Sequence, residues 1–234
     1  MYKSKKILAI VPARGGSKGI PKKNLKKIHG KSLVQIVGEC IKKTKFIDFS
    51  VISSDSDQIL NEGYKYGLQK IKRPLDLSGD NVSDIPVLIN AMTITEKLHK
   101  IKFDFVIMLQ PTSPLREVKH VENIIKKIVD EDFDTVWTVH EVDNKYHPDK
   151  QLEISKNKLK YYSRNGEKIV TRQELSKTFI KNGIGYGISR QQLLKKKKLL
   201  GIKNGFIIIK GPLVNIDDLS DLKLAKKILK KSRL

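Results

Sequence analysis

The chain has 234 residues and a formal net charge of +22 at pH 7, with 47 lysines and arginines against 25 aspartates and glutamates. Its length suits one α/β domain with a small insertion, and no segment approaches the roughly 20 apolar residues of a membrane span. The only cysteine, Cys40, cannot form an internal disulfide. Nothing therefore points to an oxidising compartment, and we expect a cytoplasmic protein.

The strong positive charge first suggests nucleic-acid binding. Only seven of the 47 basic residues are arginines, however, and the 40 lysines lie in scattered runs such as 195–198 and 226–231. Aromatic side chains do not alternate with them as they do in a base-stacking surface. We interpret the charge as a lysine-rich solvated surface and expect no nucleic-acid or membrane partner. Arginine, which is rare here, is expected where a planar bidentate donor is needed.

Predicted strands and helices alternate along the first part of the chain. Ile7–Val11 is a short apolar run typical of a buried parallel strand, and it is too short for a signal-peptide core. Ser54–Asp57 is expected to cap the helix that follows it. Further strands are predicted over Ser50–Ser53, Phe103–Leu109 and Thr135–Val139, and helices over Ser32–Lys43, Asp84–His99 and Val118–Asp130.

The pattern becomes polar over residues 140–181, with short strand-like pieces at Gln151–Ile154 and Lys158–Tyr162. We interpret this segment as an insertion within one domain of residues 1–234, used as a lid or for dimerisation. Strand patterns return afterwards at Gly185–Ile188 and Phe206–Ile209, and a last helix is predicted over Leu219–Leu229. The alternation predicts an α/β fold with a mostly parallel sheet flanked by helices. Ligands of such sheets bind at the carboxyl ends of the strands.

A glycine-rich loop, Pro12–Asn24, directly follows the first strand. Its three glycines allow the backbone to approach a ligand closely and to direct N–H groups into one concavity. Arg14 offers a bidentate fork, and Lys18, Lys22 and Lys23 offer point charges. The spacing fits neither the Walker A motif nor G-x-G-x-x-G. We therefore predict a triphosphate-binding loop of another type.

This loop resembles the signature of the CMP-sugar synthetases, the acylneuraminate cytidylyltransferase family, and the resemblance runs from Ile7 to about Leu229. It implies a Rossmann-like sheet, CTP and a carboxylated nonulosonic acid such as a sialic, legionaminic or pseudaminic acid as substrates, Mg²⁺ as cofactor, and a homodimer. The 140–181 insertion would suit a domain-swapped dimer like those of the family. The nucleotide contacts implied by the resemblance are Ala13, Arg14, Gly15, Ser17, Lys23, Asn24, Arg73 and Ser83.

Four later residues resemble the acceptor side of that family's site: Gln110, Lys150, Arg172 and Tyr186. Gln110 belongs to Leu109–Arg116, which resembles the family's strand-end motif but could be only a strand terminator. An arginine such as Arg172 suits a carboxylate, and Tyr186 could pack on the sugar. Two departures, Ser176 for proline and Phe179 for tyrosine, leave the acceptor's identity open.

The family's metal-binding Asp-x-Asp pair corresponds here to Asn215 and Asp217. Residues two apart in a strand face the same side, and an amide oxygen can still serve Mg²⁺, which retains several waters. Asp218 and Asp221 could instead cap the last helix. Arg14, Lys23 and Asp217 are thus the expected catalytic residues.

Three other functions remain open at this point. The loop would also suit a nucleotidyltransferase that uses another nucleotide or a sugar-phosphate acceptor. The net charge keeps a nucleic-acid-binding protein in view, and such a protein would bind with a steep dependence on salt. Asn215, in place of a carboxylate, would suit an inactive relative.

Overall fold

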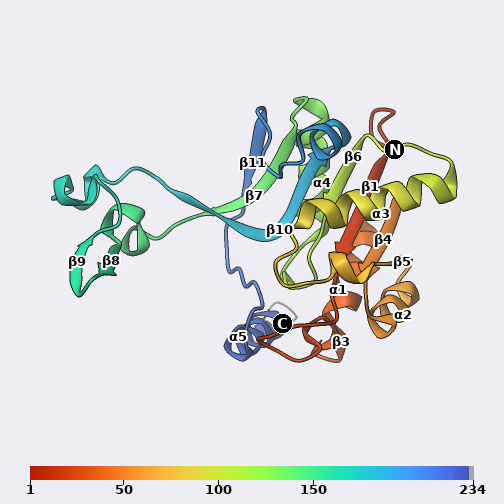
Figure 1. Cartoon of the computed structure of the whole chain (residues 1–234), viewed down its shortest axis with the longest axis horizontal. Helices are drawn as coiled ribbons and strands as arrows, with labels where there is room; N and C mark the ends of the chain where they lie inside the picture. The colour runs from red at the N-terminus through yellow and green to blue at the C-terminus, as the bar shows by residue number, and fades with distance from the viewer. Residues whose placement is uncertain (232–234) are drawn as a thin grey trace. The chain divides into compact units, whose positions relative to one another are not determined.

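The computed structural model describes residues 1–231, and the chain forms two compact units (Figure 1). The first comprises Met1–Thr138 and the chain from Asn182 onward, and the second is Val139–Lys181. No helix within residues 1–231 is both long and apolar enough to span a membrane.

A seven-stranded sheet with the order β11-β7-β10-β6-β1-β4-β5 forms the centre of the first unit. Strands β5, β4, β1 and β6 run parallel, whereas β10 runs antiparallel to β6. The prediction of a mostly parallel sheet flanked by helices is confirmed. The strands are β1 (Ile7–Pro12), β4 (Phe49–Ser54), β5 (Gln69–Lys72), β6 (Phe105–Met108), β7 (Thr135–Glu141), β10 (Phe179–Ser189) and β11 (Asn204–Ile208).

Helices cover both faces of this sheet. The burial of strand β1 requires helices on both faces. All five residues from Ile7 to Val11 are fully buried, and alternate residues face opposite sides of the sheet. Ile7, Ala9 and Val11 pack with α1, α2 and α4, while Leu8 and Ile10 pack with α3. Each fully buried Leu or Ile side chain contributes about 1.5–3 kcal/mol. The helices are α1 (Leu33–Lys43), α2 (Asp57–Lys65), α3 (Asp84–His99), α4 (Val118–Asp130) and α5 (Leu219–Lys231).

Helix starts differ in how their first N–H groups are satisfied. Ser32 caps α1 with its hydroxyl, which accepts a hydrogen bond from the Gln35 N–H at 2.9 Å. The predicted side-chain cap of α2 within Ser54–Asp57 is wrong, because Ser56 at the cap position makes no such bond. Asp55 instead accepts a hydrogen bond from the Gly15 N–H of the glycine-rich loop at 2.7 Å. The segment after β4 therefore supports that loop.

The second unit contains little buried apolar surface. Its hairpin of β8 (Leu152–Ser155) and β9 (Lys158–Tyr161) is exposed at every position. Lys156 and Asn157 both have positive φ, which suits the two-residue turn joining these strands. His147 is buried within the unit, where its Nε2 lies 3.0 Å from the Ser176 carbonyl oxygen.

Candidate active site

A cleft of about 470 Å³ opens in the first unit where β1, β5 and β6 end. Four stretches that are distant in sequence line it: the loop after β1, residues 73–87, residues 110–112, and residues 215–217. The predicted site residues that line it are Arg14, Ser17, Lys23, Asn24, Arg73, Gln110, Asn215 and Asp217. The fold thus brings together side chains that the sequence placed about 200 residues apart.

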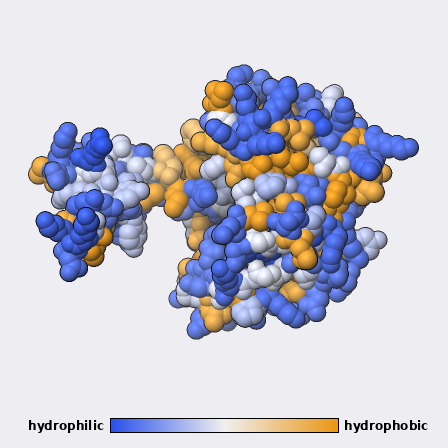
Figure 2. Space-filling view, in the orientation of Figure 1, coloured by the Kyte–Doolittle hydropathy of each residue, from blue (hydrophilic) through white to orange (hydrophobic). Residues whose placement is uncertain are grey.

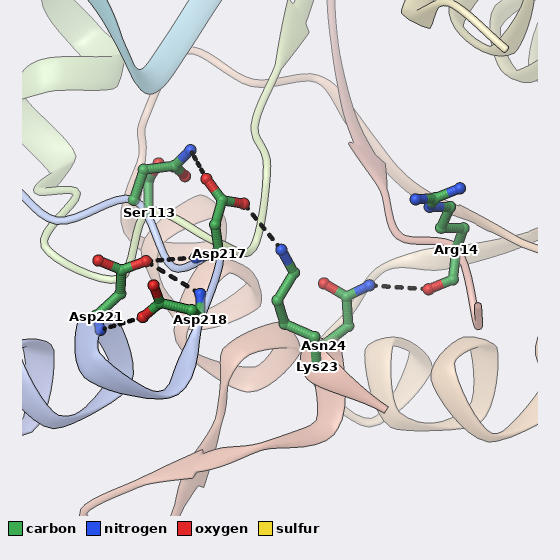
Figure 3. A network of polar contacts seen from close by, with 8 residues as sticks. Arg14, Lys23, Asn24, Ser113, Asp217, Asp218 and Asp221 are labelled. Atoms are coloured by element: carbon green, nitrogen blue, oxygen red, sulfur yellow. Dashed lines mark hydrogen bonds and ion pairs between the residues drawn. The ribbon is translucent and has the colours of Figure 1, made fainter. Parts of the chain in front are cut away.

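The glycine-rich loop is held in shape by its own side chains and by close packing. The Asn24 amide donates to the Arg14 carbonyl oxygen at 3.0 Å, so the two ends of the loop are tied together (Figure 3). Ile20 of the loop is buried in a core cluster with Ile216. At Gly19 a Cβ atom would lie 2.4 Å from the Asp217 carbonyl oxygen, so only glycine permits this approach.

Two carboxylates hold the loop's cations. Asp80 pairs with Arg14 and, at 2.7 Å, with Lys18, and these partners, Lys18 first, hold its pKa below the ordinary value. Asp217 pairs with Lys23 at 3.0 Å (Figure 3). Phosphate oxygens are the natural replacements for carboxylate oxygens at such cations. The cleft is therefore charged to receive an anion with several oxygens.

Arg73 lies at the end of β5 and is only 6 % exposed. Its guanidinium donates to the Ser53 hydroxyl at 3.2 Å and to the Ser53 carbonyl oxygen at 2.8 Å. Burial lowers the pKa of this group. Arg73 is thus a preorganised donor whose position is set by β4.

The three aspartates at the start of α5 have two different roles: Asp217 lines the cleft, whereas Asp218 and Asp221 cap the helix. Asp221 accepts hydrogen bonds from the N–H groups of Asp217 and Asp218, and Asp218 accepts one from the Asp221 N–H (Figure 3). Asp218 also accepts hydrogen bonds from Ser220. The capping alternative for Asp218 and Asp221 is therefore the one that the structure supports. Only Asp217 directs its side chain into the cleft.

Asn215 lies between Ser113 and Asp217. The Ser113 hydroxyl donates to Asn215 Oδ1 at 3.4 Å, and Asn215 Nδ2 lies 3.5 Å from Asp217 Oδ2. No group of three or more His, Cys, Asp and Glu side chains suited to a metal occurs within residues 1–231. One carboxylate and one amide still fit Mg²⁺ if water and phosphate oxygens complete the ligands, because this ion is commonly held that way.

Several predicted nucleotide contacts lie outside the cleft lining. Ala13 is 1 % exposed, packs in the core, and donates its N–H to the Ser53 carbonyl oxygen at 3.0 Å. The N–H of Gly15 is bonded to Asp55. Ser83 is exposed at the cap position of α3 but makes no capping bond with its side chain. The Ala13 side chain therefore does not line the cleft, and the nucleotide contacts of Ala13, Gly15 and Ser83 remain predictions.

Tyr186, which is expected to pack on the sugar, does not line the cleft, and its sugar contact remains a prediction. Its ring is 7 % exposed and packs edge-on against Trp137, with ring centroids 5.3 Å apart. It belongs to the core cluster under α3 because it follows the buried pattern of β10. Lys150 and Arg172 belong to the second unit and are exposed there, so their sugar contacts remain predictions.

Sequence reasoning placed Asp55 in a helix cap and assigned Asp80 no contact of its own. Asp55 directly follows β4, and Asp80 lies in the loop between η2 (Leu75–Leu77) and α3. The available signal was their position, because acidic residues after parallel strands lie at the ligand-binding edge of the sheet. Their pairing with the glycine-rich loop depends on the tertiary structure.

A parallel sheet that carries a cationic glycine-rich loop and an acidic residue across one cleft defines a nucleotidyltransferase. A family model described as "Cytidylyltransferase" matches residues 8–203. The chain belongs to this cytidylyltransferase family, and the sequence-based assignment is confirmed.

Relatives of known name extend over nearly the whole chain. The chain is 29 % identical to "Post-translational flagellin modification protein B" of Campylobacter coli, with 97 % of each chain covered. It is 28 % identical to a pseudaminic acid cytidylyltransferase of Campylobacter jejuni, covering 96 % of this chain and 97 % of that one. It is 29 % identical to the CMP-N,N'-diacetyllegionaminic acid synthase of the same species, covering 95 % and 94 %.

A solved structure of CMP:2-keto-3-deoxy-manno-octonic acid synthetase complexed with CTP has the same fold. The TM-score is 0.70 at 19 % identity, with 97 % of this chain and 100 % of that chain covered.

Proposed function

We propose that this protein transfers CMP from CTP to the anomeric hydroxyl of a nonulosonic acid and releases pyrophosphate. The supporting observation is the single cleft in which Arg14, Lys23 and Arg73 face Gln110 and Asp217. The names of the relatives support the choice of acceptor class, because they specify pseudaminic and legionaminic acids.

The triphosphate would replace the carboxylates that occupy the loop's cations. Arg14 and Lys18 would exchange Asp80 for phosphate oxygens, and Lys23 would exchange Asp217. Ser17 and Asn24 would complete this side of the site, with Arg73 and Ser83 nearer the nucleoside. Exchange of one anion for another keeps these cations paired.

The reaction itself requires no covalent intermediate on the protein. The acceptor hydroxyl would attack the α-phosphorus in line as the bond to pyrophosphate breaks, and the hydroxyl proton would leave to solvent. Arg14 and Lys23 would hold the charged oxygens in place, and Gln110 would orient the acceptor. Catalysis would rest on positioning and on neutralisation of charge.

We further propose Mg²⁺ as the cofactor, held by Asp217 with the help of Asn215. When bound, the ion would neutralise charge on phosphate oxygens. The donors fit this ion because both are oxygen ligands and the cleft leaves space for water. In this proposal Asn215 replaces a second carboxylate and so lowers the affinity for the metal.

The second unit would serve as the dimer contact of a homodimer. It exposes large apolar side chains such as Ile154, Leu159 and Val170, which are 78 %, 64 % and 86 % exposed. Apolar surface of this kind marks protein interfaces. From this unit, Arg172 is proposed as the contact to the acceptor's carboxylate and Lys150 as another contact to the sugar. A cytoplasmic location would suit an enzyme that consumes CTP.

The test is a pyrophosphate-release assay with each of four nucleoside triphosphates and a panel of acceptors. The panel contains sialic, legionaminic and pseudaminic acids, and a sugar phosphate as the competing acceptor class. Release that requires both CTP and a nonulosonic acid, with a CMP-sugar identified by mass spectrometry, would support the proposal. Pyrophosphate release with another nucleotide, or only with the sugar phosphate as acceptor, would contradict the proposal and favour a different nucleotidyltransferase.

A further inference from the structure

Arg116 is a buried arginine directly behind the cleft. Its side chain belongs to the segment that links β6 to α4, and the residue is 7 % exposed. The guanidinium donates three hydrogen bonds, and all three acceptors are main-chain carbonyl oxygens. These are Gln110 at 2.6 Å, Gly183 at 3.3 Å and Ile184. No salt bridge within residues 1–231 includes Arg116.

These acceptors lie on two separate parts of the chain. Gln110 begins the loop after β6 and lines the cleft, whereas Gly183 and Ile184 lie in β10. Gly183 has a φ of +74°, and a Cβ atom there would lie 2.8 Å from Ser113 Oγ and 3.4 Å from Asn215 Oδ1. The backbone beside the cleft is therefore tightly packed where the arginine joins it.

The same loop also holds the segment that carries Asp217. The Ile216 N–H donates to the Thr112 carbonyl oxygen at 2.8 Å, and the Ser113 hydroxyl donates to Asn215. A shift of residues 110–116 would therefore move Gln110 and the Asn215–Asp217 segment together. Arg116 joins this loop to β10 and so restrains both.

An arginine suits this position for a geometric reason. Its planar fork can donate in two directions at once, which a lysine ammonium does not match. Burial lowers the pKa of Arg116 to about 10, so the group still carries its charge at neutral pH. Burying a cation without a carboxylate costs free energy, and hydrogen bonds to three carbonyl oxygens offset that cost.

We propose that Arg116 is a positioning residue for the acceptor side of the cleft: it fixes Gln110 and the Asn215–Asp217 segment relative to β10. This inference rests on the proposed function, because it assigns Gln110 and Asp217 to the acceptor and the reacting phosphate. Gly15 and Arg73 have supports of their own in Asp55 and Ser53. Gly19 and Lys23, at the other end of the nucleotide loop, contact Asp217 and share its restraint.

The kinetic test compares Arg116→Lys with the wild type. The acceptor KM should rise about tenfold and kcat should fall about tenfold, while the KM for CTP changes less than about twofold. Arg190→Lys is the matched control, because Arg190 is bonded to Glu96, which the cleft lining does not include. Equal changes in the KM values for CTP and acceptor, or no change in either, would overturn the proposal.

A second measurement does not depend on turnover. Hydrogen–deuterium exchange should become faster in peptides covering 110–116, 182–186 and 214–217 of Arg116→Lys, and stay unchanged in peptides covering 7–15. Uniformly faster exchange would mean a merely structural role and would overturn the proposal. If wild-type protein forms no CMP-sugar, the proposed function fails, and the exchange pattern still decides whether Arg116 restrains these segments.

Arg116→Ala with added guanidinium ion gives a further check. The ion should restore part of the lost acceptor affinity, and ammonium ion should not, because only a planar donor can reach both groups of carbonyls. Equal restoration by both ions would contradict the proposed geometry.

Discussion

The two units of this protein obtain their structure in different ways. In the first, the charged residues of the cleft are attached to strands whose side chains are fully buried, such as Ile7–Val11 of β1. In the second, both strands of the β8–β9 hairpin are exposed at every position, and Figure 2 shows hydrophilic surface interrupted by apolar groups there. An isolated hairpin is marginally stable in water. The comparison therefore suggests that the first unit preforms the nucleotide site, whereas the second needs a covering surface.

The largest expected effect tests the first unit. Asp217→Ala should lower kcat about 10²–10³-fold, because it removes the only carboxylate of the segment before α5 that reaches the cleft. Pyrophosphate release at saturating substrates measures this, and size-exclusion chromatography should show the wild-type oligomer.

The control for that change is Asp218→Ala. Asp218 accepts hydrogen bonds from Ser220 and Asp221 at the start of α5, so its loss should lower the melting temperature. Turnover should stay near the wild-type value. Unchanged turnover in Asp217→Ala would remove that residue from the catalytic site.

A change in the second unit should have the opposite pattern. Ile154→Asp replaces an apolar side chain that is 78 % exposed by a charged one, and it should weaken the proposed dimer at least about tenfold. Sedimentation velocity over a range of concentrations measures this. CTP binding, measured by calorimetry, should remain within about twofold of wild type, because the cleft lies in the first unit.

Lys158→Asp is the matched change in the same hairpin. It adds the same charge without removing apolar surface, so we expect a smaller effect on assembly. If the wild-type chain is monomeric, the second unit is stable without a partner, and the proposed dimer contact is wrong.

A smaller effect is expected at Asn215, the amide that stands where the resemblance implies a metal-binding carboxylate. Asn215→Asp should lower the Mg²⁺ concentration for half-maximal activity about fivefold, since it supplies a second anionic oxygen on the same side as Asp217. Binding of Mn²⁺, followed by electron paramagnetic resonance without substrates, should tighten in parallel. If neither quantity changes, Asn215 does not contribute to a metal site.

The smallest effect is expected at Asp80, which pairs with Arg14 and Lys18 in the absence of nucleotide. Asp80→Asn frees Arg14 and Lys18 and should tighten CTP binding about two- to threefold at low salt, and less at high salt. The neighbouring Asp76→Asn should have no such effect. Weaker CTP binding in Asp80→Asn would mean that Asp80 orders the loop instead of competing with phosphate.

The direction of the Asp80 pKa shift determines how the contact of Asp80 with Lys18 and Arg14 depends on pH. Lys18 and Arg14 hold the pKa of Asp80 below its ordinary value of 3.8. The contact is therefore fully formed above that pH and is lost only as the pH falls through the lowered value. Between pH 6 and 8, the difference in CTP affinity between Asp80→Asn and wild type should be constant, as titration calorimetry can check.

The sequence by itself determined the local elements and the nucleotide loop. Helices α3 and α4 have the predicted bounds, because apolar spacing and first-turn residues are local signals. The strand, the glycines and the cations of Pro12–Asn24 likewise indicated phosphate binding without knowledge of their neighbours.

Tertiary structure alone decided which segments meet and which side chains turn away. Tyr186 enters the core because β10 runs antiparallel beside β6, which no local pattern specified. Asp217 reaches the cleft while Asp218 and Asp221 cap α5, although all three lie within five residues. The role proposed for Arg116 depends on the nearby Gln110 carbonyl together with carbonyl groups about 70 residues away. Such pairings depend on how the sheet is assembled, and the spacing of residues along the chain does not record it.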